Sequence, residues 1–280
     1  MDDFRDDPFF QYPRTPYPTS EGDVAMPILY FDDSNFMALF FVDHEAARAM
    51  AAVEGFEAVR FGNGRALVGV AFYDYRLTTI GPYGEVGVAI AATVPGMPRP
   101  RLPLLSLFRP PDRNRVGFHI VDLPVTTPAA CAAGREIWGY PKFVTPISFA
   151  SKDGTFAGSV TDPQTGTPMV TLAGRCGPGV PAPLLDLVLY SRHHGEVLRG
   201  LAVTRGGGRL CLPGSVRLDV SSSSHRMARN LRDLGLAGAT PAFVAHTHRL
   251  QLRLGAGAVL PRPATAPADT PWSGKNSAIP

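Results

Sequence analysis

Glycine and proline interrupt this chain so often that long helices have little room. The sequence holds 29 glycines and 28 prolines among 280 residues, and both residue types favour turns over helix interiors. Short runs rich in Val, Ala, Phe and Tyr lie between them, a composition typical of strands. The expected strands cover residues 36–42, 65–77, 86–94, 116–121, 145–151, 155–161, 198–204, 209–212 and 244–254.

Two short loops and three helix starts complete this pattern. Lys152-Asp153-Gly154 predicts a hairpin turn, and Gly206-Gly207-Gly208 predicts a second one. Helices are expected from a cap at Asp43 to residue 53, from Thr127-Pro128 to residue 138, and from a cap at Ser224 to residue 234. Many strands with few helices favour a β-rich α+β domain, a barrel or sandwich with its helices packed outside.

The composition of the two ends sets the expected domain limits. Residues 1–25 are polar and acidic, and we expect an N-terminal arm there. Residues 262–280 are rich in Pro, Ala and Ser, which predicts a disordered tail. No linker or repeat interrupts the part between them, so residues 26–261 are predicted to form one domain.

Charge and cysteine content exclude several classes of protein. Apolar residues make up 45% of the chain and charged residues 18%, unlike a disordered protein. A net charge of +3 without a basic run gives no nucleic-acid groove, and no apolar run is long enough for a membrane span. Cys131, Cys176 and Cys211 are far apart, which predicts neither a zinc pair nor a disulfide framework and favours the reducing cytoplasm.

Lysine is scarce, so each one can be weighed separately. The chain has Lys142, Lys152 and Lys275, and Lys142 stands among Trp138, Tyr140 and Phe143. Apolar surroundings disfavour the ammonium form of a lysine, and a neutral amine can attack a ketone to give an iminium, an electron sink for carbanion chemistry. The alternative is an ordinary lysine whose aliphatic stem packs along aromatic rings.

Gly134-Arg135-Glu136, followed by Gly139-Tyr140-Pro141-Lys142, resembles the active-site signature of the acetoacetate decarboxylase family. The resemblance implies a β-barrel-centred domain with a closed, largely apolar cavity, usually assembled into oligomers. It implies that Lys142 forms the Schiff base and that no metal or organic cofactor is needed. Tyr83-Gly84-Glu85 resembles the family's second site, which makes Glu85 the expected proton shuttle facing the lysine.

Departures from the family pattern bear on the reaction. Phe143 stands where the decarboxylases carry a second lysine, residues 26–42 contain no arginine, and no glutamate lies between Glu57 and Glu85. We therefore expect a lyase acting on a small 2-oxo or 3-oxo acid, with aldolase or dehydratase chemistry favoured over decarboxylation. Trp138, Tyr140 and Phe143 are expected to form a desolvating wall, and Tyr83 to contact the substrate.

His246 and His248 alternate with Val244 and Leu250 on one face of the last predicted strand. A His-x-His pair on a strand resembles the metal site of cupin barrels, but the glutamate that follows it there is missing. We expect barrel-lining histidines that contact substrate, without a metal. Three functions stay open at this point: an imine-forming lyase of the cytoplasm acting as a homo-oligomer, a non-catalytic binding barrel, and a metal-dependent barrel.

Overall fold

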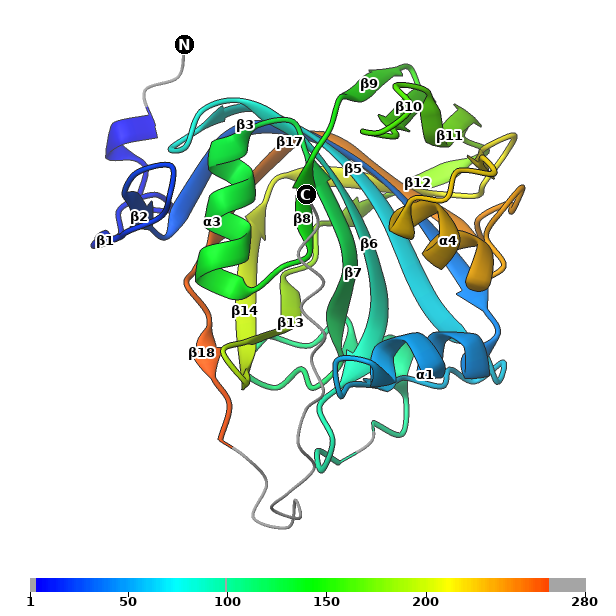
Figure 1. The fold of residues 1–280 in the computed structure, drawn as a ribbon, viewed down its shortest axis with the longest axis horizontal. Helices are drawn as coiled ribbons and strands as arrows, with labels where there is room; N and C mark the ends of the chain where they lie inside the picture. Colours follow the sequence, from blue (N-terminus) through cyan, green and yellow to red (C-terminus); the bar gives the residue numbers. More distant parts are fainter. Residues whose placement is uncertain (1–3, 99, 262–280) are drawn as a thin grey trace.

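The computed structural model describes residues 4–98 and 100–261 and is built around a closed barrel (Figure 1). Its neighbouring strands are antiparallel, except that β7 and β13 run parallel, and β14 pairs with β17 to close the ring. The barrel strands are β3 (Ile28–Val42), β5 (Ala66–Thr78), β6 (Tyr83–Thr93), β7 (Gly117–Val125), β13 (Leu187–His193), β14 (Glu196–Arg205) and β17 (Phe243–Leu254). The prediction of a β-rich α+β domain around a barrel is confirmed.

Shorter strands extend the barrel, and a second sheet packs beside it. β8 pairs in parallel with β7, while β15 and then β12 continue the sheet from β17. These additions are β4 (Glu57–Ala58), β8 (Lys142–Val144), β12 (Gly179–Pro183), β15 (Gly207–Cys211) and β18 (Ala258–Val259). The second sheet holds β9 (Ile147–Lys152), β10 (Thr155–Thr161), β11 (Pro168–Arg175) and β16 (Arg217–Val220).

The main core lies outside the barrel, between its wall and the second sheet. Phe36 of β3 and Phe72 of β5 are fully buried there. Phe156 of β10 stacks on Phe36 with ring centroids 4.1 Å apart. Burial of these aromatic rings, together with helix α4, fixes the second sheet on the barrel.

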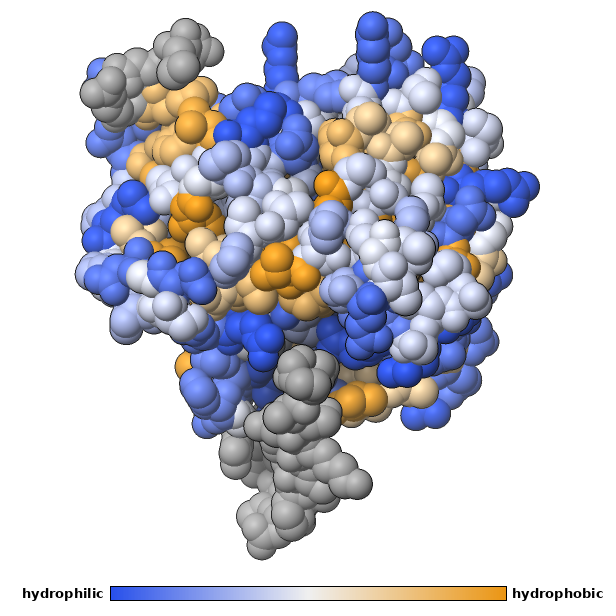
Figure 2. All heavy atoms as spheres, turned by 45° about the horizontal axis from the view of Figure 1, so that its top comes forward, coloured by the Kyte–Doolittle hydropathy of each residue, from blue (hydrophilic) through white to orange (hydrophobic). Residues whose placement is uncertain are grey.

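Within residues 4–98 and 100–261, four α-helices surround this frame: α1 (His44–Ala52), α2 (Pro103–Ser106), α3 (Pro128–Trp138) and α4 (Arg226–Asp233). In Figure 1, α3 stands beside β8, which it contacts, whereas α4 lies on the opposite side near the second sheet. Figure 2 shows apolar side chains in separate patches among polar ones on the face drawn. In the part of the chain that the structure describes, no helix is both long and apolar enough to cross a membrane.

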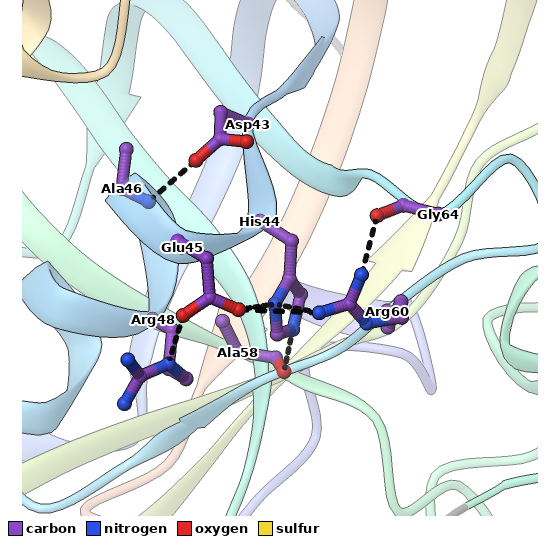
Figure 3. Close-up of polar contacts among 8 residues, drawn as sticks. All are labelled: Asp43, His44, Glu45, Ala46, Arg48, Ala58, Arg60 and Gly64. Carbon is purple, nitrogen blue, oxygen red and sulfur yellow. Dashed lines mark hydrogen bonds and ion pairs between the residues drawn. The ribbon is translucent and has the colours of Figure 1, made fainter.

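A polar cluster fixes the start of α1 (Figure 3). The Asp43 carboxylate accepts a hydrogen bond from the Ala46 backbone N–H, as an N-cap does. Arg60 donates to His44 Nδ1 at 2.9 Å and to Glu45, while His44 Nε2 lies 3.2 Å from the Ala58 carbonyl oxygen. The cluster joins α1 to the β4 segment and has a structural role.

Several local predictions were wrong, each for a physical reason. Gly206–Gly208 does not form a hairpin, because β14 and β15 both pair with β17 and the chain continues in one direction. Gly206 has φ +134, and a Cβ there would lie 1.9 Å from the Arg249 carbonyl oxygen. His225, not Ser224, caps α4. The expected turn at Lys152-Asp153-Gly154 does connect paired strands.

The N-terminal residues are more than an arm. β1 (Thr15–Tyr17) pairs with β2 (Val24–Met26), and Phe10 is buried. Asp7 forms an ion pair with Arg205 of β14, and Ser20 donates a hydrogen bond to Glu136 of α3. The segment thus packs on the barrel. The tail predicted for residues 262–280 lies outside the described residues.

Candidate active site

The side chains of Lys142 and Glu85 meet inside the barrel, although they come from strands on opposite sides of β7. Lys142 begins β8, which pairs with β7 at Leu123, and Glu85 lies on β6, paired with Val125 of β7. The Lys142 Nζ lies 2.6 Å from Glu85 Oε2, and each residue is only 8% exposed. In such an ion pair each charge stabilises the other, because either charge alone would be costly to bury.

The path of the chain explains how the lysine reaches this place. Gly139 takes a left-handed conformation, φ +69, and ends α3, so Tyr140 and Pro141 lead directly into β8. A Cβ on Gly134 would lie 2.3 Å from Lys142 Cδ, so the lysine stem occupies the space that a larger residue would fill. Close packing of the Lys142 side chain against α3 therefore explains why the Gly-Arg-Glu motif begins with glycine.

Three buried tyrosines surround the carboxylate. The Tyr75 hydroxyl donates to Glu85 Oε1 at 3.3 Å, and the hydroxyls of Tyr30 and Tyr83 lie 2.9 Å apart. Burial, reinforced by the charge of Glu85, raises the pKa of Tyr30 and Tyr75 well above the ordinary value. These side chains therefore stay protonated and act as hydrogen-bond donors.

Trp138 and Tyr140 form an aromatic wall beside the lysine. Their rings stack with centroids 5.7 Å apart, and Trp138 Nε1 donates to the Gly255 carbonyl oxygen at 3.0 Å. The buried Tyr140 hydroxyl has no hydrogen-bond partner in the described structure, and burial raises the pKa of this phenol. A buried donor without a partner is available to a bound ligand.

These groups line one end of a cavity of about 410 Å³ in the barrel. The predicted residues that line it are Lys142, Glu85, Tyr83, Trp138, Tyr140 and His246. Tyr30, Tyr73 and Tyr75 line it as well, although they belong to no motif that pointed to a site. Alternation at Tyr73 and Tyr75 on a predicted strand was a usable signal for a shared face.

Phe143 does not belong to this wall. Successive side chains of a strand point to opposite faces, and Phe143 lies against the ring of His225, with centroids 4.7 Å apart. It is absent from the cavity lining. The prediction for Phe143 was therefore wrong, and a cation at this position would also point away from the cavity.

The side chains of the two histidines of β17 lie in different environments. Pairing with β3 shifts between Thr247 and Leu250, which breaks the alternation of the strand. Thr247 is consequently buried and His248 is exposed, outside the cavity lining. His246 borders the cavity, but its ring stacks with Phe36 at a centroid distance of 6.0 Å. The shared inward face predicted for both histidines was wrong.

One group of possible metal ligands occurs among the described residues. Ligand atoms of Cys176, Cys211 and His246 all lie within 4.8 Å of one another. Cys176 packs against the core that contains Phe36, and burial is the main cause that raises its pKa to about 11. The group does not include Lys142 or Glu85.

A second buried carboxyl lies near the tyrosines. Asp33 is fully buried on β3, and neither of its oxygens has a hydrogen-bond partner in the described structure. Desolvation raises its pKa to about 9, so the group is held as a neutral acid. No sequence signal distinguished Asp33 from its exposed neighbour Asp32.

Comparisons with known proteins agree with this fold. The family model described as acetoacetate decarboxylase (ADC) matches residues 14–208. A solved acetoacetate decarboxylase from Legionella pneumophila is similar to the chain, with a TM-score of 0.61 and 16% identity over 93% of this chain and 96% of that one. Fold and family match together define an acetoacetate-decarboxylase-like protein. The chain belongs to the acetoacetate decarboxylase family.

Two further solved structures share the fold. The enduracididine biosynthesis enzyme MppR, in complex with pyruvate, aligns with a TM-score of 0.56 and 15% identity over 89% of this chain and 98% of that one. An acetoacetate decarboxylase-like enzyme from Sphingomonas wittichii has a TM-score of 0.54 and 14% identity, covering 85% and 94% of the two chains. The sequence matches no curated protein.

Proposed function

We propose that this protein is an imine-forming lyase that acts on an oxo acid through Lys142. The observation that carries the proposal is the buried Lys142 amine held 2.6 Å from the Glu85 carboxylate at one end of an apolar cavity. Membership in a family of enzymes and the pyruvate complex of MppR support it. Neither a metal nor an organic cofactor is required, because the iminium itself withdraws electrons.

In the proposed reaction, Lys142 first gives a proton to Glu85 and becomes a neutral amine. The amine nitrogen attacks the keto carbon, and loss of water leaves a protonated imine. Loss of this water returns Glu85 to its carboxylate. In aldol cleavage, that carboxylate takes the proton of the β-hydroxyl, the carbon–carbon bonding pair moves toward the imine to give an enamine, and Glu85 then protonates the enamine. In dehydration, Glu85 instead removes the α-proton to give the enamine and protonates the β-hydroxyl, which leaves as water and gives an α,β-unsaturated imine. Hydrolysis of the imine releases the product and the free lysine.

Aldol-type or dehydration chemistry stays our preferred outcome over decarboxylation. Phe143 does not support this preference, because its side chain points away from the cavity. Strand β3 does support it, since it contributes Tyr30 and Asn35 to the wall but no arginine to bind a substrate carboxylate. Carbon dioxide release from acetoacetate at about 10 per second, an ordinary enzymatic rate, would contradict this preference.

Reductive trapping tests the imine directly. Pyruvate or acetoacetate with cyanoborohydride should add one substrate to the protein, and peptide mapping should place it on Lys142. Lys152 in the β9–β10 turn is exposed, so Lys152→Ala is the matched control and should trap normally. An adduct that survives in Lys142→Ala would overturn the assignment.

The second candidate is a non-catalytic binding barrel, and the cavity alone would serve it equally well. It predicts binding of an oxo acid without any reduced adduct. Assembly into a homo-oligomer and a cytoplasmic location stay predictions of the sequence, to be checked by light scattering and by cell fractionation.

A further inference from the structure

The cavity continues along the barrel beyond the residues that surround Lys142. We propose that the substrate is an oxo acid with a long apolar chain, and that this chain extends along the barrel interior beyond the tyrosines. The inference rests on the proposed imine chemistry and adds the substrate class. Two observations support it: the length of the cavity along the barrel and the apolar character of its wall.

Small side chains create the room. Gly69 and Ala71 of β5 and Gly87 and Ala89 of β6 all line the cavity. Tyr73 is paired with Glu85, and the wall continues along β5 from there to Leu67. At about 3.3 Å per residue, this stretch of strand measures about 20 Å. A small keto acid would leave most of that length empty.

The wall beyond the tyrosines offers little to a polar substrate. Met37, Leu39 and Phe41 of β3 line it, together with Phe118 and Ile120 of β7. The polar residues of the lining are largely engaged, and these five each hydrogen-bond to a backbone group: Asn35, Asn114, Asp186, Arg209 and Thr247. Burial of hydrocarbon is therefore the main attraction available to a ligand there.

The two ends of the cavity differ in chemistry. At the lysine end, the hydroxyl of Tyr140 is a free donor for the polar head of an oxo acid. At the other end, Leu104, Leu107 and Phe108 of the α2 segment line the cavity. Leu104 and Phe108 are also exposed on the surface, as are Leu102 and Leu105 beside them. The apolar end thus lies under a surface segment that is itself apolar.

Chain length is the variable that tests this proposal. Each buried methylene should strengthen binding about fourfold. We expect the Lys142 adduct of 2-oxodecanoate to reach half-saturation at a concentration at least 100-fold lower than that of pyruvate. Titration with each acid under cyanoborohydride, followed by mass spectrometry, measures both values on the full-length protein.

Gly69→Val narrows the cavity beyond the lysine end. Gly69 is paired with Ala89, and a Cβ there would make ordinary contact with Leu39, 3.6 Å away, so the fold accommodates the first added carbon. We expect this variant to lose most of the advantage of 2-oxodecanoate while trapping pyruvate normally. Gly62→Val is the matched control, because a Cβ on Gly62 meets nothing within 4 Å.

A binding measurement separates this inference from the imine chemistry. Decanoate has no keto group, and calorimetry should detect its binding to Lys142→Met but much weaker binding of butyrate. Decanoate binding with no adduct from any oxo acid would contradict the proposed function and support the apolar site. Equal half-saturation for pyruvate and 2-oxodecanoate, or an unchanged preference in Gly69→Val, would overturn the inference.

Discussion

The two faces of β5 and β6 carry apolar side chains of very different size in the middle of these strands. On the outer face, Val70, Phe72, Val88 and Ile90 are fully buried in the core outside the barrel. On the inner face, the same two central strands place Gly69, Ala71, Gly87 and Ala89 along a cavity. The outer face uses large side chains for stability, while the inner face leaves space for a ligand.

The largest expected effect of a single change lies on the inner face. Glu85→Gln keeps the shape of the side chain but removes the proton shuttle, so turnover should fall ~10²–10⁴-fold. Imine trapping on Lys142 should become slower but persist, because the variant lacks the carboxylate that accepts the amine proton but keeps the nucleophilic nitrogen. Steady-state kinetics and trapping yields measure the two separately. Glu136→Gln is the control, since Glu136 binds Ser20 away from the cavity.

Unchanged turnover in Glu85→Gln would contradict the role of Glu85 as the proton shuttle. An equal loss of turnover in Glu136→Gln would contradict it as well, because the effect would then not be specific to the cavity. Turnover is to be measured on the oxo acid that the wild-type protein converts fastest.

Truncation of a side chain on the outer face should lower the stability of the protein more than truncation on the inner face. Phe156→Ala leaves a void beside the stacked ring of Phe36 and should lower the free energy of unfolding by about 3–5 kcal/mol. Leu39→Ala on the inner face enlarges a cavity that already exists, so we expect a loss of about 1–2 kcal/mol. Urea denaturation compares them. Equal losses would show that the barrel interior is packed as tightly as the outer core.

Gly134→Ala should impair the site more than the fold. The added methyl would displace the Lys142 stem from its place on α3, and we expect trapping to slow by about tenfold, as for ~1.4 kcal/mol. Alanine favours the helix by about 1 kcal/mol over glycine, which offsets part of the steric cost. Cys131→Ala on the same helix is the control. An unchanged trapping rate would show that the lysine tolerates another position.

The smallest effect concerns Asp33, where the pairing of β3 shifts. Its folded pKa of about 9 lies above the unfolded value, so the stability from this group is greatest below about pH 4. That stability is lost as the pH rises toward 9. Asp33→Asn cannot ionise in the unfolded chain, so it should be more stable than the wild-type protein at neutral pH, and this difference should shrink as the pH falls toward 4. Thermal unfolding at several pH values checks this, and an identical pH dependence in both proteins would contradict it.

The sequence predicted much of the fold because local signals were strong. Asp43 and Thr127 cap helices as expected, and Lys142 lies just after the helix that ends at Trp138, although the short strand that it begins was not predicted. The position of Lys142 inside the barrel followed from the family motif, whereas its contact with Gly134 required coordinates.

The choice of inner and outer face was harder to predict. Both faces of β5 and β6 are apolar, so alternation of polar and apolar residues could not distinguish them. A shifted register turned His248 outward, and a one-residue step placed Phe143 on the far side of β8. Such shifts depend on pairing between distant strands, which no local pattern encodes.

A crystal structure of the protein after reduction with 2-oxodecanoate tests the central claim most directly. We predict electron density that continues from Lys142 Nζ into the ligand, beside Glu85, with the alkyl chain running past Gly69 toward Leu67. Ligand density that is separate from Lys142, or a reduced adduct on another lysine, would contradict the account.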